Sequence, residues 1–254
     1  MKLISWNLNG IKARHDRLLA LLDRSAPDVV LLQELKSEDA TFPGDGVRAR
    51  GYELHTHGQK AYHGVALLAR AGATDVRRGL EDGVDDPQAR LISGVIGGVR
   101  FASVYAPNGE RVGSEKFAYK LAFYARLVAW ARARVAEGPL VLGGDFNVAP
   151  ADRDVHDPDA WRGQVLCSDD ERAALARLCD AGLSDALRAL DPERVAFTWW
   201  DYRMLGFQKN RGVRIDHFLV TVDVRERLVS FDVDRAERKG QQPSDHAPIV
   251  LSLR

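Results

Sequence analysis

The chain is poor in cysteine and carries no net charge. Its two cysteines among 254 residues, Cys167 and Cys179, exclude a disulfide framework. The 36 Lys and Arg residues balance 36 Asp and Glu residues, so any nucleic-acid binding must come from the placement of charges and not from their sum. The longest apolar runs, such as Val29–Leu32 and Val65–Ala69, are far too short to span a membrane, and we expect no membrane partner.

The chain does have enough apolar residue for a large core. Hydrophobic residues make up 45% of it and charged residues 28%, a balance that excludes global disorder. No segment has the composition of a linker or a repeat. Asn7 and Asn9 interrupt the apolar N-terminal run and argue against a signal peptide, so we expect a cytoplasmic protein.

Short apolar segments separated by turn signals predict strands. Several have apolar residues at consecutive positions, as expected of strands covered on both faces. The sequence Ile96-Gly97-Gly98-Val99 predicts a hairpin. The predicted strands are Lys2–Asn9, Asp28–Gln33, Gly64–Arg70, Leu91–Ile96, Val99–Ala106, Leu140–Asn147, Ile215–Val220 and Pro248–Leu253.

Three segments have the apolar period of helices. Glu171, three residues after Ser168, completes a capping box for the third, which places Cys179 on an apolar face. Strands that precede, separate and follow these helices without regular alternation favour a mixed α/β sandwich of two sheets with helices outside. The predicted helices begin near Ile11, Ser114 and Ser168 and end before Pro27, near Glu137 and at Gly182.

Polar residues stand where several predicted strands end, and there a cleft can begin. Asn7 and Glu34 follow two such apolar runs. Asp145 and Asn147 are two positions apart, so on a continuing strand both side chains point to one face. The Gly143-Gly144 pair before them indicates close approach of another backbone or a ligand.

Taken singly, these residues also have ordinary structural explanations. Asn7 and Asn9 are typical of turns, and Glu34 is either solvated or bound to a ligand. His246 lies before a terminal strand, but spacing alone does not exclude His217 in its place.

Three further histidines raise the possibility of a zinc site. His55, His57 and His63 stand on either side of a Gly-Gln-Lys turn without a supporting acid. A surface hairpin is therefore the better interpretation.

Three acids, two amides and an imidazole form a candidate oxygen-rich ligand set. Such ligands suit Mg²⁺ or Mn²⁺, which bridges phosphate oxygens during displacement at phosphorus. The pattern favours a metal-assisted phosphodiesterase or phosphatase. The residues are Glu34, Asp145, Asp245, Asn7, Asn147 and His246.

Six motifs in order resemble the endonuclease/exonuclease/phosphatase superfamily. They are Trp6-Asn7-Leu8-Asn9-Gly10, Leu32-Gln33-Glu34-Leu35-Lys36, Val104-Tyr105-Ala106-Pro107-Asn108-Gly109, Gly143-Gly144-Asp145-Phe146-Asn147, Arg214-Ile215-Asp216-His217 and Ser244-Asp245-His246-Ala247-Pro248. The segments 197–203 and 210–212 resemble the DNA-facing loop of the bacterial exodeoxyribonuclease III branch.

This resemblance implies a fold and an activity. The fold is a four-layered α/β sandwich, two packed mixed β-sheets flanked by helices, in a single catalytic domain over residues 1–254, expected as a monomer. The activities are Mg²⁺- or Mn²⁺-dependent incision of duplex DNA 5′ to abasic sites, 3′-to-5′ exonuclease action and removal of 3′ phosphates. A phosphoesterase of the same superfamily acting on a small-molecule or lipid phosphate is the alternative, and a non-catalytic nucleic-acid-binding module a third possibility.

The resemblance also implies catalytic roles. Tyr105 contacts the scissile phosphate. Asp145 activates water or protonates the leaving oxygen, and Asn147 orients the phosphate or the water. His246, held by Asp216, contacts the phosphate.

Metal and DNA contacts are implied in the same way. Glu34 binds the ion with Asn7 nearby and Asp245 helping, and Asp145, Asn147 and His246 complete the candidate ligand set. Asn108, Trp199, Arg203 and Arg211 are implied to touch DNA, Trp199 lining a sugar pocket together with Val213 and Ile215. The other basic residues expected near DNA are Lys12, Arg14, Lys116, Lys120, Lys209 and Arg214.

Overall fold

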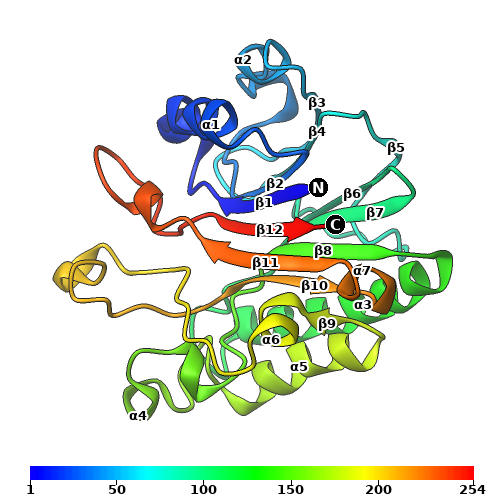
Figure 1. Ribbon diagram of the computed structural model, residues 1–254. Coiled ribbons are helices and arrows are strands. Elements are labelled where there is room, and N and C mark those ends of the chain that lie inside the picture. The colour runs from blue at the N-terminus through cyan, green and yellow to red at the C-terminus, as the bar shows by residue number, and fades with distance from the viewer.

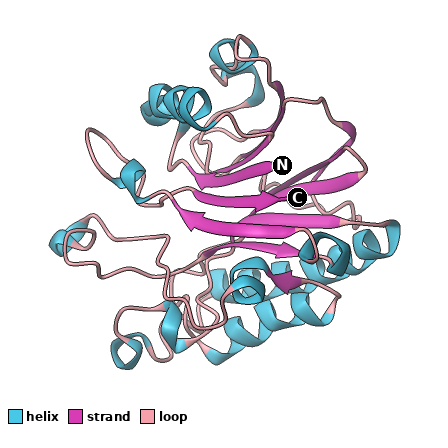
Figure 2. Cartoon of the chain, viewed as in Figure 1, coloured by secondary structure: helices cyan, strands magenta, loops and turns pink.

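Two six-stranded sheets pack face to face, with helices on both outer faces (Figures 1 and 2). The computed structural model describes residues 1–254. The first sheet has the order β11 (Leu228–Val233), β12 (Ile249–Leu253), β1 (Lys2–Asn7), β2 (Val29–Gln33), β4 (Val65–Ala69), β3 (Glu53–His57). The second has the order β5 (Thr74–Arg78), β6 (Leu91–Ile96), β7 (Val99–Tyr105), β8 (Leu140–Asp145), β10 (Asp216–Val220), β9 (Ser184–Asp185). The predicted four-layered α/β sandwich is confirmed.

Consecutive apolar residues of a strand pack on opposite faces of its sheet. Leu31 belongs to the cluster between the two sheets, whereas its neighbour Leu32 packs under α1 (Ile11–Ser25). In the second sheet Val141 faces the first sheet, and Leu142 packs against α3 (Glu115–Glu137) and α5 (Asp169–Asp180). This alternation follows from the two-residue period of a strand.

The three predicted helices form with the expected ends. Ala26, in the left-handed conformation at φ 44°, ends α1 before Pro27. Ser114 caps α3, and Ser168 with Glu171 forms the capping box of α5. The prediction for Cys179 is wrong: its side chain is exposed, because the buried stripe of α5 follows Glu171, Ala174, Leu175 and Leu178 and leaves position 179 beside it.

The shorter helices lie in the connections. They are α2 (Asp45–Arg48), α4 (Pro158–Trp161), α6 (Ala186–Leu190), α7 (Val222–Arg225) and the 3-10 turns η1 (Asp39–Thr41), η2 (Asp152–Asp154), η3 (Arg203–Leu205) and η4 (Arg235–Arg238). None of the helices combines the length and the apolar composition needed to cross a bilayer.

In both sheets, the strand ends that carry the candidate site residues lie at the same end of the sandwich, which is called the site edge below. β1 and β2 are parallel, as are β7 and β8, so the carboxyl ends of these four strands point the same way within each sheet. β12 runs antiparallel to β1, and β10 antiparallel to β8, so both strands begin at this edge. In Figure 1 the edge lies at the left, where the loops before β10 and β12 project.

Candidate functional site

Sheet register brings three polar residues of the second sheet together. Tyr105 pairs with Asp145 across β7 and β8, and Asp145 pairs with Asp216 across β8 and β10. The first sheet contributes Asn7 at the end of β1, whose Nδ2 donates a hydrogen bond of 2.9 Å to Asp145 Oδ2. The site therefore spans both sheets.

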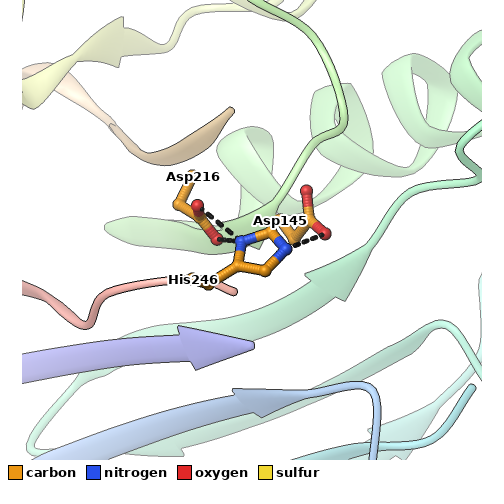
Figure 3. Close-up of side chains that lie close together, drawn as sticks. All are labelled: Asp145, Asp216 and His246. Atoms are coloured by element: carbon orange, nitrogen blue, oxygen red, sulfur yellow. Dashed lines mark hydrogen bonds and ion pairs between the residues drawn. The ribbon is translucent and has the colours of Figure 1, made fainter. Parts of the chain in front are cut away.

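His246 lies between two carboxylates (Figure 3). Its Nδ1 is 2.9 Å from Asp216 Oδ2, and its Nε2 is 3.7 Å from Asp145 Oδ2. Burial alone lowers the pKa of the imidazole, but the charges of Asp216 and Asp145 outweigh it and raise the pKa to about 10. The ring is therefore an imidazolium at neutral pH.

Asp145 is a buried carboxyl, 1% exposed. Its burial raises the pKa to about 7, against the opposing charge of His246 and the hydrogen bond from Asn7. A carboxyl that titrates near neutrality is suited to proton transfer.

Asn147 meets Asp145 by a different route from the one predicted. β8 ends at Asp145, and Asn147 adopts φ 52°, so a tight turn and not a continuing strand brings the two together. The Asn147 amide N–H donates to Asp145 Oδ1 at 2.9 Å and its Nδ2 to Asp145 Oδ2 at 3.2 Å. Phe146, between them in the chain, is buried in the core.

The two glycines before Asp145 serve packing. A Cβ on Gly144 would lie 1.9 Å from the Val104 carbonyl oxygen, and one on Gly143 would lie 2.7 Å from Leu31 and Phe218 side-chain atoms. The predicted close approach is thus made by β7 and the core. It lets Asp145 sit beside Tyr105.

Tyr105 faces the acids of the site. Burial, Glu34 and Asp145 together raise the pKa of its phenol well above the usual value, so the hydroxyl stays protonated and can donate a hydrogen bond. Arg90 lies 5.1 Å from the Tyr105 ring centroid and donates to the Tyr105 carbonyl at 2.9 Å. Arg90 lies in none of the sequence motifs, so its role was not predicted.

A buried ion pair supports the loop after β7. Asn108 donates from Nδ2 to Asn147 Oδ1 at 3.2 Å. Lys120 Nζ donates to the Asn108 carbonyl at 3.0 Å and the Asn147 carbonyl at 2.7 Å, and pairs with Glu171. Lys120 is fully buried, so its predicted place near DNA is wrong.

A second network of polar side chains lies beside the one around Asp145 and His246. Glu34 pairs with Lys36 at 3.0 Å, and Lys36 Nζ donates to Asn9 Oδ1 at 2.6 Å. Asn9 Nδ2 in turn donates to Asp245 Oδ1 at 2.9 Å, and Trp199 donates to the other Asp245 oxygen at 3.0 Å. Sequence reasoning left Asn9 as a turn residue and missed Lys36, although both lie inside quoted motifs.

The donor set fits a hard divalent cation. Asp145, Asp216 and His246 have candidate ligand atoms within 4.8 Å of one another, but of these only the two carboxylates have lone pairs for an ion while His246 is an imidazolium. Glu34 and Asp245 add carboxylates that retain free lone pairs, because Glu34 Oε1 takes part in one ion pair and each Asp245 oxygen accepts one hydrogen bond. Oxygen donors without a thiolate are the ligands such ions prefer.

The aromatic and basic residues expected at DNA divide into surface and core. Trp199 is half-buried, and Arg203 and Arg211 are exposed, as are Lys12, Lys116 and Lys209. Val213 and Ile215 are buried beneath Trp199, so their predicted part in lining a sugar pocket is wrong. Arg214 is buried too, paired with Asp154 at 2.6 Å and Asp185 at 2.8 Å, and is no DNA contact.

The competing histidines have structural places. His217 is fully buried and its Nε2 lies 2.9 Å from the Val148 carbonyl, so it does not replace His246. His55 and His57 lie on β3, which pairs antiparallel with β4, and His63 lies in the connecting turn, confirming the hairpin. His55, His57 and His63 are not part of the group of candidate metal ligands formed by Asp145, Asp216 and His246.

Comparison with known proteins settles the family. The model of the endonuclease/exonuclease/phosphatase family matches residues 4–246. The chain belongs to this family. It is 39% identical to an exodeoxyribonuclease III of Haemophilus influenzae, an alignment that covers 98% of each chain, and 32% identical to an exodeoxyribonuclease of Bacillus subtilis, covering 100% of this chain and 99% of the other. The predicted resemblance is confirmed.

Solved structures of family members share the fold. A 3′ phosphatase from Neisseria, NExo, bound to product DNA hairpin, superposes with a TM-score of 0.98 at 40% identity, covering 100% of this chain and 99% of that one. An AP endonuclease from Archaeoglobus fulgidus superposes with a TM-score of 0.95 at 33% identity, with the same coverage.

Proposed function

We propose that this chain is a DNA-repair nuclease that hydrolyses phosphodiester bonds in duplex DNA: it incises 5′ to abasic sites, degrades 3′ ends and removes 3′ phosphates. The observation that carries the proposal is that Tyr105, Asp145 and the Asp216–His246 pair lie together at one end of the sandwich. A family relative described as a 3′ phosphatase is seen with a DNA hairpin, and others are named exodeoxyribonuclease or AP endonuclease. A small-molecule phosphatase is not favoured.

Charge at the reacting phosphate is met by His246 and Tyr105. The imidazolium, held by Asp216, stabilises the negative charge that develops on the phosphoryl oxygens. The Tyr105 hydroxyl donates to one of these oxygens. Because both groups are fixed before the substrate arrives, little reorganisation is required.

Asp145 is the group that moves a proton. Asn7 and Asn147 hold its carboxylate, leaving it free to take a proton from the attacking water or give one to the leaving oxygen. Either role relies on the same raised pKa. Asn147, bonded to Asn108 as well, orients the phosphate or the water.

A divalent cation, Mg²⁺ or Mn²⁺, is held in our proposal by Glu34, with Asn7 and Asp245 nearby. When bound, it supplies Lewis-acid charge stabilisation to the phosphate. When no cation is bound, the ion pair with Lys36 neutralises the charge of Glu34.

The proposed surface for the DNA backbone lies beside the catalytic residues. Asn108, Trp199, Arg203 and Arg211 are proposed to contact it, with Lys12, Lys116 and Lys209 adding positive charge. Phosphate contacts carry no base information, so we expect selection by duplex shape and backbone damage. We also propose that residues 1–254 act as one catalytic domain and as a monomer in the cytoplasm.

A labelled duplex with one abasic site tests this function. We expect incision 5′ to the site with Mg²⁺ or Mn²⁺ and none in EDTA. If neither ion supports incision while the protein hydrolyses a small phosphate ester, the proposal is contradicted and the phosphoesterase alternative is favoured.

A further inference from the structure

Turn hydrogen bonds hold the outer part of the loop 197–212 internally, such as those from the Lys209 N–H to the Leu205 carbonyl at 3.0 Å and from the Arg211 N–H to the Gly206 carbonyl at 2.8 Å. Met204 and Leu205 are 75% and 57% exposed and both adopt left-handed backbone conformations, at φ 55° and 57°. Arg203 and Arg211 also lie at the surface. These turns fix the local path of the loop, whereas its placement on the sandwich depends on the residues packed against it.

Two arginines of η4 pack against the loop, Arg235 at the surface and Arg238 buried. The Arg235 guanidinium lies 4.9 Å from the Trp200 ring centroid and 5.2 Å from that of Phe207, which itself meets Trp200 edge-on at 5.2 Å. Arg235 also donates to Asn210 Oδ1 at 2.8 Å. This residue touches the loop at three points along its length.

Arg238 joins the loop to the catalytic segment. Its guanidinium lies 5.3 Å from the Tyr202 ring centroid and donates to the Trp200 carbonyl at 3.2 Å. The same group donates to the Ser244 carbonyl, and Ser244 Oγ accepts the His246 amide N–H at 3.1 Å. Arg238 is 6% exposed, so these contacts are shielded from solvent.

The turn that carries both arginines is itself fixed. Glu237, 6% exposed, pairs with Arg17 at 2.9 Å and with Arg24 at 3.0 Å, both from α1. The guanidinium groups of η4 therefore act from a rigid base on the sandwich. Planar arginines that stack on aromatic rings are poorly replaced by lysine.

We propose that Arg235 and Arg238 are positioning residues that hold the loop 197–212 in the shape that binds duplex DNA, with Arg238 also aligning this loop with the His246 segment. The proposal rests on the DNA-nuclease function above. Arg235 does not contact the segment 244–246, so its loss affects substrate binding alone. Loss of Arg238 affects binding and turnover together.

Kinetics on the abasic duplex test the arrangement. We expect Arg235→Met to raise KM roughly 3- to 10-fold with kcat unchanged, since the contacts with two aromatic rings and one hydrogen bond are lost. Arg238→Lys is expected to raise KM and to lower kcat. Arg225→Met, on the exposed face of α7, removes one positive charge at the opposite end of the sandwich and should match the wild-type protein.

Arg235→Lys separates positioning from direct phosphate contact. Lysine keeps the charge but not the planar stack, so we expect Arg235→Lys to behave like Arg235→Met and both to keep the wild-type salt dependence of KM. A wild-type KM for Arg235→Lys or Arg235→Met would overturn the proposal. Failure of the wild-type protein itself to incise the duplex would instead contradict the proposed function.

Discussion

His246 Nδ1 lies 2.9 Å from an Asp216 carboxylate oxygen, although the two residues are 30 positions apart in the chain. Asp216→Asn removes the charge that contributes most to raising the His246 pKa. We expect kcat for abasic-site incision to fall on the order of 10²- to 10⁴-fold, because the ring loses its charged orienting partner. Asp223→Asn, at an exposed position of α7, is the matched control, and an equal kcat for both variants would contradict the role.

Exposed Arg203 and Arg211 are expected to bind DNA phosphates. Alanine at either position should weaken duplex binding on any sequence and reduce the slope of log Kd against log salt by about 1. Titrations of fluorescent duplex between low and moderate salt measure this slope. An unchanged slope in both variants would place the DNA elsewhere.

The buried Lys120–Glu171 pair is expected to stabilise the site from behind. Lys120→Met leaves the Glu171 charge without its partner and two carbonyl groups without a donor, and should lower the free energy of unfolding by about 3–5 kcal/mol. Urea unfolding measures this loss. Adding Glu171→Gln should recover part of it by removing the orphaned charge; no recovery would contradict the assignment.

His217 is expected to make stability depend on pH. Burial lowers its pKa to about 4, so it adds stability that is present above the unfolded pKa of about 6.5 and is lost as pH falls towards 4. From these values the loss between pH 7.5 and pH 5 is about 2 kcal/mol. Urea unfolding should show a smaller pH-dependent loss for His217→Gln than for the wild-type protein, and equal losses would refute the assignment.

Much of the fold was predictable because interior strands carry apolar residues on two faces. Three strands that the sequence did not indicate, β5, β9 and β11, are edge strands of the two sheets, and the fourth edge strand, β3, was indicated only as part of a surface hairpin. An edge strand needs less apolar surface: β5 reads Thr-Asp-Val-Arg-Arg, and β9 has only two residues. Their identity as strands comes from pairing with a neighbour, which the local sequence does not encode.

The polar residues of the site were predictable from short motifs at strand ends, whereas their supports were not. Lys120 and Arg214 are charged in sequence and buried in space, because each finds an acid far along the chain, Glu171 and Asp154 respectively. Asn147 reached its place through a turn with positive φ that strand alternation does not anticipate. The local sequence does not distinguish a charged residue that stays at the surface from one that is buried against an acid far along the chain.

Asp145→Asn gives the most direct test of the claim that one centre between the two sheets hydrolyses every substrate. The variant keeps the side-chain shape and one of the two acceptor oxygens, but it cannot exchange a proton. Incision at an abasic site, 3′-end degradation and 3′-phosphate release should be measured in parallel, together with duplex binding. We predict that the three activities fall together by several orders of magnitude while binding persists; loss of one with retention of another would contradict a single centre.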